Sequence, residues 1–214
     1  MTQPLNISGI LPSLCLKAGL GPPRTECGVG ALMPWADRLW AVTYVSSKSK
    51  SGVGTGLYEI DESLNIVQRP ESYVGTYTNR FVHFESNQLI IGPWVIDAER
   101  NVRTIEALLE VRICSTMKHL DDPENKVYML GMEGEFFEMD VHSLEVKQLF
   151  DLVEELKLPP VEEVHYNIPH FKAAHCDYGR VVVANNSYGP PDYEGRAAVG
   201  RLAEWDGTAW TILE

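Results

Sequence analysis

The chain has 214 residues, and its 30 acidic against 18 basic side chains give a formal net charge of −12. Bulk attraction to nucleic acid or to an anionic membrane needs clustered lysine and arginine, so this charge argues against both partners. A hydrophobic share of 44% indicates a globular chain with a sizeable core rather than a disordered one.

The N-terminal stretch lacks the basic region that begins a secretory leader, and no run approaches the roughly 20 apolar residues of a membrane helix. We therefore expect a cytoplasmic protein as the sequence stands, or a periplasmic or secreted one if a leader has been removed. The four cysteines are widely spaced and form no CxxC pair. This spacing predicts no zinc or redox motif, and we expect no bound metal and no cofactor.

Four segments share one ending along the chain, an apolar and acidic pattern that closes on aspartate. They are GLYEID at 56–61, WVID at 94–97, EFFEMD at 135–140 and RLAEWD at 201–206. A short β-type run follows each of them. The pattern predicts a hairpin in which the aspartate and a polar neighbour supply the turn.

Two further strands precede each of these hairpins. The nearer runs are RLWAVTYV at 38–45, QLIIGPW at 88–94, KVYMLGM at 126–132 and RVVVANNS at 180–187; the earlier ones are GALMPW at 30–35, RFVHFE at 80–85, RICSTMKH at 112–119 and PHFKAAH at 169–175. A four-stranded unit repeated at this spacing is typical of β-propeller blades. An antiparallel sandwich is the alternative, because it also has many strands joined by turns.

We therefore predict an all-β chain, a β-propeller of four-stranded antiparallel blades in one domain over 1–214. The four blades are expected at about 29–70, 79–106, 111–150 and 168–214, with a short helix at 151–158. The blades either close on themselves or form half of a larger ring. A homodimer or other homo-oligomer that completes such a ring is the favoured arrangement.

Basic and titratable residues gather on the innermost strands, which line the channel of a propeller. His83, His170, Arg80 and Lys172 lie on first strands, and Asn79 lies at the start of one. Long loops on one rim carry tyrosines nearby, including Tyr77, Tyr166 and Tyr188. We predict His83, His170 and Tyr166 as catalytic residues, and Asn79, Arg80, Lys172, Tyr77 and Tyr188 as substrate-binding residues. A lone histidine on an inner strand is more often a hydrogen-bonded filler.

A basic, tyrosine-rimmed concavity suits an anionic, hydroxyl-rich ligand such as a glycan that contains uronic acid. In β-elimination, Arg80 or Asn79 would stabilise the enolate-like charge, His83 or His170 would act as base, and Tyr166 or a second histidine as acid. Hydrolysis is the other reaction. It usually requires two carboxylic acids at a defined separation, and no such pair stands out on the inner strands.

The sequence also resembles a family. The stretches ECGVGALMPWADRLWAVTY, TNRFVHFESNQLIIGPWVID and KVYMLGMEGEFFEMD, together with GRVVVANNSY and GRLAEWDG, look like blades of large β-propeller proteins of bacterial polysaccharide degradation, which include rhamnose–glucuronate glycosidases and lyases. The resemblance implies a propeller, a glycan ligand and a catalytic histidine near the axis, for which His83 and His170 fit best. Those relatives are usually longer and have more blades.

Three functions remain open on the sequence. The chain is a polysaccharide lyase or glycoside hydrolase, a propeller that binds a glycan or a protein without catalysis, or a truncated and inactive relative of such an enzyme. A fold does not decide between them.

Overall fold

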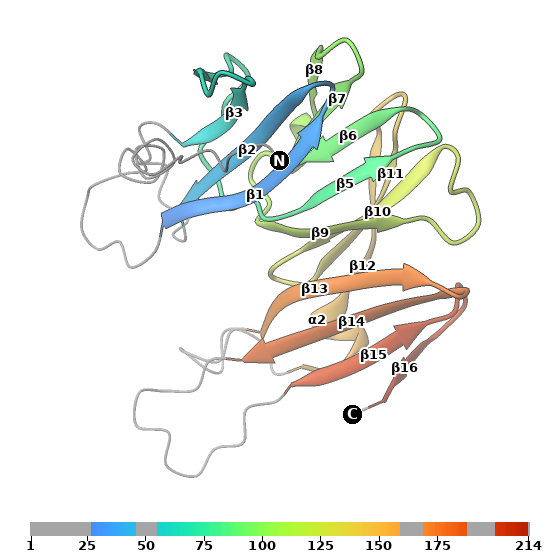
Figure 1. Ribbon diagram of the computed structural model, residues 1–214. Helices are drawn as coiled ribbons and strands as arrows, with labels where there is room; N and C mark the ends of the chain where they lie inside the picture. The colour runs from blue at the N-terminus through green and yellow to red at the C-terminus, as the bar shows by residue number, and fades with distance from the viewer. Residues whose placement is uncertain (1–26, 46–54, 159–168, 188–199, 214) are drawn as a thin grey trace, which may run out of the picture. The chain divides into compact units, whose positions relative to one another are not determined.

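The computed structural model describes residues 27–45, 55–158, 169–187 and 200–213. These residues form four antiparallel sheets of four strands each, and within each sheet the strands follow one another in chain order (Figure 1). We call the sheets blades 1 to 4. The all-β class and the four four-stranded blades predicted from the sequence are confirmed. Whether the blades close alone or form part of a larger ring stays a prediction.

Each blade is a meander of four strands. Blade 1 contains β1 (Cys27–Trp35), β2 (Arg38–Val45), β3 (Gly56–Ile60) and β4 (Ile66–Gln68). Blade 2 contains β5 (Arg80–His83), β6 (Gln88–Ile91), β7 (Trp94–Asp97) and β8 (Val102–Thr104). Blade 3 contains β9 (Ile113–Lys118), β10 (Lys126–Gly131), β11 (Glu135–Asp140) and β12 (Val146–Asp151). Blade 4 contains β13 (Pro169–Asp177), β14 (Arg180–Ser187), β15 (Arg201–Trp205) and β16 (Trp210–Ile212).

Two short helical turns interrupt the strands of the described chain. The helix predicted at 151–158 is the single turn α2 (Leu152–Glu155), in which the Asp151 carboxylate accepts the backbone N–H of Val153 at 2.9 Å. It ends early, because Lys157 adopts a positive φ of 53°. The 3₁₀ turn η1 (Glu106–Leu108), which buries Leu108, was not predicted from the sequence.

The chain divides into two compact units. The first contains the residues up to Arg80 together with Gln88–Glu110, so it includes blade 1 and strands β6 to β8. The second contains Phe81–Asn87 and the chain from Val111 onward, so it includes blades 3 and 4. That all blades belong to one domain stays a prediction.

The recurring aspartates act as predicted, since each one closes the turn between the third and fourth strands of its blade. One carboxylate oxygen accepts two backbone N–H groups in every case: those of Ser63 and Asn65 at Asp61, Glu99 and Asn101 at Asp97, His142 and Ser143 at Asp140, and Thr208 and Ala209 at Asp206. These local bonds satisfy turn N–H groups that no strand can pair. The repeated aspartate therefore has the same role in every blade. The second N–H comes from four residues on at Asp61 and Asp97 and from three residues on at Asp140 and Asp206.

Each blade has two faces, because side chains alternate along a strand. The forward face of blade 1 carries Trp40, Val42 and Leu57. The pairings of β10 with β11 and of β14 with β15 identify the residues at the equivalent positions of blades 3 and 4. These are Tyr128, Leu130 and Phe136 in blade 3, and Val182, Ala184 and Leu202 in blade 4. The backward face is the opposite one and carries Leu39, Ala41 and Ile60 in blade 1.

Within the second unit, the backward face of blade 4 packs on the forward face of blade 3. The Trp205 ring lies 5.6 Å from Tyr128 and 6.1 Å from Phe136, each in an edge arrangement. The valines Val181 and Val183 are fully buried in the same cluster. This blade-on-blade contact forms the main core of the second unit.

Candidate functional site

His83, predicted as a catalytic residue, lies at the end of β5 with a side chain that is almost fully buried. Its Nε2 is 2.9 Å from the Pro123 carbonyl oxygen, which can only accept, so Nε2 carries the proton. Its Nδ1 then accepts the backbone N–H of Ser86 at 3.2 Å and the Ser86 hydroxyl at 2.7 Å. Both ring nitrogens therefore hold turns of the protein, and a catalytic role for His83 stays a prediction.

His119 repeats this arrangement in blade 3. Its Nδ1 accepts the backbone N–H groups of Asp121 and Asp122 at 3.1 and 3.0 Å, and its Nε2 lies 2.9 Å from a carboxylate oxygen of Glu138. The ring also stacks on Tyr128 at 4.2 Å. A histidine at the end of a first strand thus closes the turn that follows in both blades.

His170, the other predicted catalytic histidine, is on β13 and lies beside a guanidinium group. Its Nε2 is 3.5 Å from Nη1 of Arg112, and the same Nη1 donates to the Glu133 carboxylate at 2.7 Å. The Nε of Arg112 is buried and has no hydrogen-bond partner among the described residues. The three side chains come from the starts of β9 and β13 and from the turn after β10. Glu133 therefore holds the Arg112 guanidinium next to His170.

Lys172 is exposed and follows His170 by two residues, at the point where the pairing of β13 with β14 shifts. Its charge acts on Cys114 of β9, whose pKa burial raises to about 12 against the opposing effects of Ser115 and Lys172. The strand that carries Lys172 lies against β9, since the backbone N–H of Ala174 donates to the Ser115 hydroxyl at 3.1 Å. Arg112, His170 and Lys172 gather in one region of the second unit.

The remaining predicted residues belong to the first unit and lie differently. Tyr77 is fully buried, its hydroxyl donates to the Leu109 carbonyl oxygen, and burial raises its pKa. Asn79 is also buried and donates its side-chain N–H to the Gly92 carbonyl oxygen at 3.0 Å. Arg80 is exposed. The ring of Tyr77 offers no accessible face for a sugar in this packing, and the predicted ligand contacts of all three stay predictions.

Tyr166 and Tyr188 lie outside the described residues.

Arg112 was not among the residues predicted from the sequence, although its place in the chain could have indicated it. Arg112 is the first residue of the run predicted as the first strand of blade 3, as Arg80 is of the run in blade 2. Glu133 gave no such signal, because it lies within the glycine-containing turn between β10 and β11, where the sequence does not indicate which way a side chain points.

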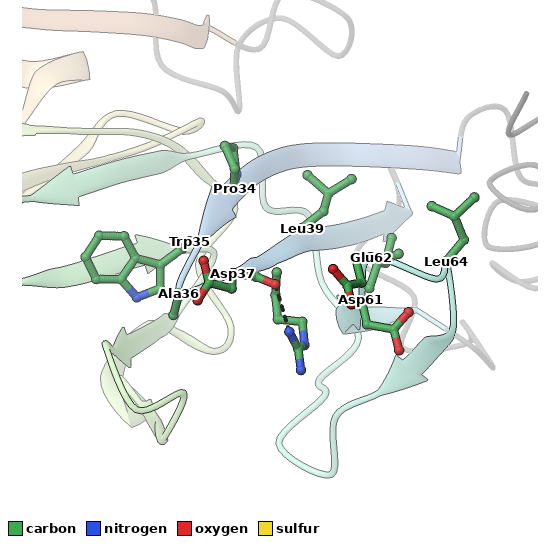
Figure 2. Close-up of a pocket in the computed structure, with 10 residues that line it drawn as sticks. Pro34, Trp35, Ala36, Asp37, Leu39, Asp61, Glu62 and Leu64 are labelled. Atoms are coloured by element: carbon green, nitrogen blue, oxygen red, sulfur yellow. Dashed lines mark hydrogen bonds between the residues drawn. The ribbon is translucent and has the colours of Figure 1, made fainter. Parts of the chain in front are cut away.

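Blade 1 has a pocket of about 560 Å³ at its turn edge (Figure 2). Its apolar wall includes Leu39, Ile60 and Leu64 of the backward face, and residues 34–38 of the β1–β2 turn close one side. The carboxylates of Asp37, Asp61 and Glu62 stand around it, as Figure 2 shows. The pocket combines an apolar floor with an acidic rim.

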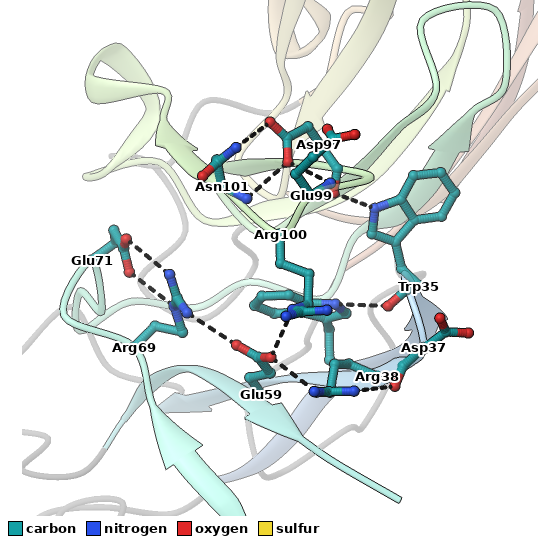
Figure 3. Close-up of polar contacts among 11 residues, drawn as sticks. Trp35, Asp37, Arg38, Glu59, Arg69, Glu71, Asp97, Glu99, Arg100 and Asn101 are labelled. Carbon is teal, nitrogen blue, oxygen red and sulfur yellow. Dashed lines mark hydrogen bonds and ion pairs between the residues drawn. The ribbon is translucent and has the colours of Figure 1, made fainter.

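On the forward face of blade 1, Glu59 binds three arginines (Figure 3). The distances from its carboxylate oxygens are 3.1 Å to Nε of Arg38, 3.0 Å to Nη1 of Arg69 and 3.4 Å to Nε of Arg100. Arg100 comes from the last turn of blade 2, whereas Arg38 and Arg69 come from blade 1 and the segment after it. The network therefore joins two blades of the first unit.

Over the described ranges, no group of three or more His, Cys, Asp and Glu side chains is placed to hold a metal ion. No helix in the same ranges is long and apolar enough to cross a membrane.

No family model and no curated protein matches the sequence. Solved structures with a similar arrangement include a Saccharomyces cerevisiae assembly of Dbp5 bound to Nup159, Gle1, IP6 and ADP (16% identity, TM-score 0.44) and the N-terminal domain of Nup159 (16%, TM-score 0.42). Each match covers 86% of this chain and 47% of the other. PorZ, a surface component of the type-IX secretion system of Porphyromonas gingivalis, matches at 9% identity and a TM-score of 0.34, over 86% of this chain and 32% of its own. The chain thus spans less than half the length of these structures, and at these TM-scores the likenesses assign no function.

Proposed function

We propose that the chain is a non-catalytic binding protein whose ligand carries a carboxylate, with a uronic-acid-containing glycan as the ligand class. The observation that carries the proposal is the position of Arg112, held by Glu133 at 2.7 Å beside His170, with the exposed Lys172 two residues further along β13. The resemblance of the blade sequences to propellers of polysaccharide degradation favours a uronate among carboxylate ligands.

Arg112 suits this role because Glu133 engages only one of its terminal nitrogens. A guanidinium presents five N–H donors in a planar fork, so an oriented arginine retains donors for a second carboxylate. Its side chain is 17% exposed, which shields such a contact from water and keeps the arginine rigid. Lys172 adds a second positive charge at the surface of the same region.

We propose binding rather than catalysis because histidine nitrogens that could transfer a proton already bind other groups of the protein. His83 binds the Pro123 carbonyl oxygen and the turn at Ser86, and His119 binds the Glu138 carboxylate and the turn at Asp121 and Asp122. His170 has a guanidinium beside its Nε2. A general acid and base pair needs two groups within reach of one ligand. Among the described residues, His170 is the one histidine of the Arg112 region, and the Glu133 carboxylate beside it is already bound by the Arg112 guanidinium at 2.7 Å.

The test is calorimetric titration of the native chain with a glucuronate-containing disaccharide and with the matching neutral disaccharide. We expect saturable heat with the uronate only, and a loss of affinity of at least about tenfold in Arg112→Gln, because charge-assisted hydrogen bonds contribute about 1.5–3 kcal/mol. Arg103→Gln, an exposed arginine of the first unit, is the matched control and should bind as the native chain does. Equal binding of both sugars, or an unchanged affinity in Arg112→Gln, would overturn the proposal.

A further inference from the structure

The forward face of blade 4 is exposed where the corresponding faces of other blades are buried. Trp40, Val42 and Leu57 in blade 1 are each 0% exposed, and Tyr128, Leu130 and Phe136 in blade 3 are at most 1% exposed. At the same positions in blade 4, Leu202 is 37% exposed, Ala184 is exposed and Val182 is half-buried. Leu213, which pairs with Leu202 at the edge of the blade, is 51% exposed. Within the part of the chain that the structure describes, nothing covers this apolar face, which marks it as an interaction surface.

Two contacts inside the chain show what covers such a face. In the second unit, blade 4 lays its backward face on the forward face of blade 3 through Trp205, Val181 and Val183. In the first unit, the last turn of blade 2 reaches the forward side of blade 1, where Arg100 binds Glu59 and the Trp35 indole N–H donates to the Asp97 carbonyl oxygen at 3.0 Å (Figure 3). In the second unit the next blade covers the forward face with its backward face, and in the first unit the next blade reaches the forward side with its last turn.

The same chain offers a matching backward face on blade 1. Leu39, Leu64 and Ile66 are only partly buried there, and the pocket of about 560 Å³ opens beside them (Figure 2). In the contact between blades 1 and 2, Trp35 near the first turn of one blade binds the last turn of the next. The first turn of blade 4 carries Tyr178, which is 94% exposed. Its ring is therefore in the position to reach the last turn of a blade 1, where the pocket lies.

Charge complements this fit. Arg180 next to Tyr178 is 47% exposed and lies 3.7 Å from Glu204, so it has donors left for another carboxylate. The pocket on blade 1 is rimmed by Asp37, Asp61 and Glu62. An exposed arginine and an exposed aromatic ring on one surface thus meet an acidic rim and an apolar floor on the other.

We propose that two copies of this chain associate through these surfaces, with blade 1 of one copy covering the forward face of blade 4 of the other. Tyr178 occupies the pocket on blade 1, Leu202 packs near Leu39 and Leu64, and Arg180 faces Glu62. Because the two surfaces lie on different blades, a two-fold pair makes the contact twice.

The test is light scattering of the native chain after size exclusion, over a range of concentrations and with a reducing agent present. We expect a mass of twice 24.0 kDa. Tyr178→Ala and Leu202→Glu should each weaken the dimer by at least about tenfold, as is usual for a central aromatic or apolar contact. A native mass of one chain at every concentration, which self-closure of a single chain would also give, overturns the proposal.

Two controls make the result specific. Phe84→Ala removes another exposed aromatic, 81% exposed at the first turn of blade 2, and should leave the dimer unchanged. Arg180→Glu should weaken the dimer, and Glu62→Lys in the same chain should restore it, because the pair is then reversed in sign. A Tyr178→Ala chain that dimerises like the native protein, or a charge reversal without rescue, would contradict the proposed contact.

Discussion

The indole N–H of Trp35 donates to the backbone carbonyl oxygen of Asp97 at 3.0 Å, and this bond ties the first turn of blade 1 to the last turn of blade 2. The side chain of Asp97 meanwhile closes its own turn through the N–H groups of Glu99 and Asn101. One short turn thus serves two purposes, since it ends a hairpin and docks that hairpin on the neighbouring blade. The adjacent Arg100 extends the contact to Glu59.

Glu59→Gln should lower the free energy of unfolding by about 2 kcal/mol, because three arginines lose the carboxylate that binds them. Hydrogen bonds to charged groups contribute more to stability than hydrogen bonds between neutral groups. Arg100→Met should cost only about 0.5 kcal/mol, since that side chain is 41% exposed and exposed pairs contribute little. Urea unfolding of both variants measures the difference. Glu204→Gln, the equivalent position in blade 4 with one arginine at 3.7 Å, is the control and should change little. Equal losses in Glu59→Gln and Glu204→Gln would refute the network as a stabilising feature.

The four turn aspartates should make stability fall in acid. Hydrogen bonds lower the pKa of each carboxyl. The donors are the Asn65 side chain at Asp61, the Ser143 N–H at Asp140 and the Ala209 N–H at Asp206. At Asp97, burial raises the pKa, but the hydrogen bonds from Asn101 lower it and the pKa is lower on balance. A pKa that is lower in the folded than in the unfolded chain stabilises the fold while the group is ionised.

The contribution is therefore fully present above the ordinary value of 3.8 and is lost as pH falls through the lower folded values. Urea unfolding at a series of pH values from 6 downward should show this decline. The double variant Asp97→Asn and Asp140→Asn keeps acceptor oxygens but cannot titrate, so its decline should be smaller. If native and double-variant profiles run parallel, the turns are not the origin of the acid sensitivity.

His83→Ala should destabilise the second unit by about 1–3 kcal/mol, because the Pro123 carbonyl oxygen and the Ser86 N–H lose a common partner. Ligand affinity measured below the unfolding temperature should stay within about twofold of the native value, since the proposed site lies at Arg112. His142→Ala keeps the backbone N–H that donates to Asp140, so it is the control and should be nearly neutral. Loss of binding in a fully folded His83→Ala chain would instead support the role predicted from the sequence.

Gly30→Ala should be among the most destabilising single changes, by about 2–4 kcal/mol. A Cβ at Gly30 would stand 2.0 Å from the carbonyl oxygen of Tyr77, which is backbone and cannot rotate away. Gly28→Ala is a close control on the same strand, because its nearest contact would be at an ordinary 3.8 Å. Thermal unfolding should separate the two variants clearly, and similar midpoints would show that β1 can shift at low cost.

The fold was predictable because its signals are local and repeated. A strand that ends in aspartate before a β-type run predicts a turn that this aspartate closes, and Asp61, Asp97, Asp140 and Asp206 each close one. Even the basic residue that begins a second strand recurs with a glutamate in the third, as in Arg38 with Glu59, Lys126 with Glu138 and Arg180 with Glu204. Such pairs follow from strand register alone.

The site was harder to predict because it depends on contacts distant in sequence. Nothing local to His83 indicates that its ring donates a hydrogen bond to the carbonyl oxygen of Pro123, 40 residues away. Likewise, nothing near Tyr77 indicates that its hydroxyl donates to the carbonyl oxygen of Leu109. Inner-strand position predicted His170 and Lys172 as neighbours within the repeat, but it did not identify Glu133 as the group that holds Arg112 beside them. Asn79 belongs to the first unit and His170 to the second, and the site that the sequence predicted for both stays a prediction.

If the chain binds a uronate without transforming it, prolonged incubation with a saturating glucuronate-containing oligosaccharide should leave the sugar unchanged. Absorbance of unsaturated uronate and chromatography of the recovered sugar would be followed for the native chain and for His170→Ala. We expect intact oligosaccharide and no rise in absorbance for either the native chain or His170→Ala. Time-dependent product formed by the native chain and lost in His170→Ala would contradict it.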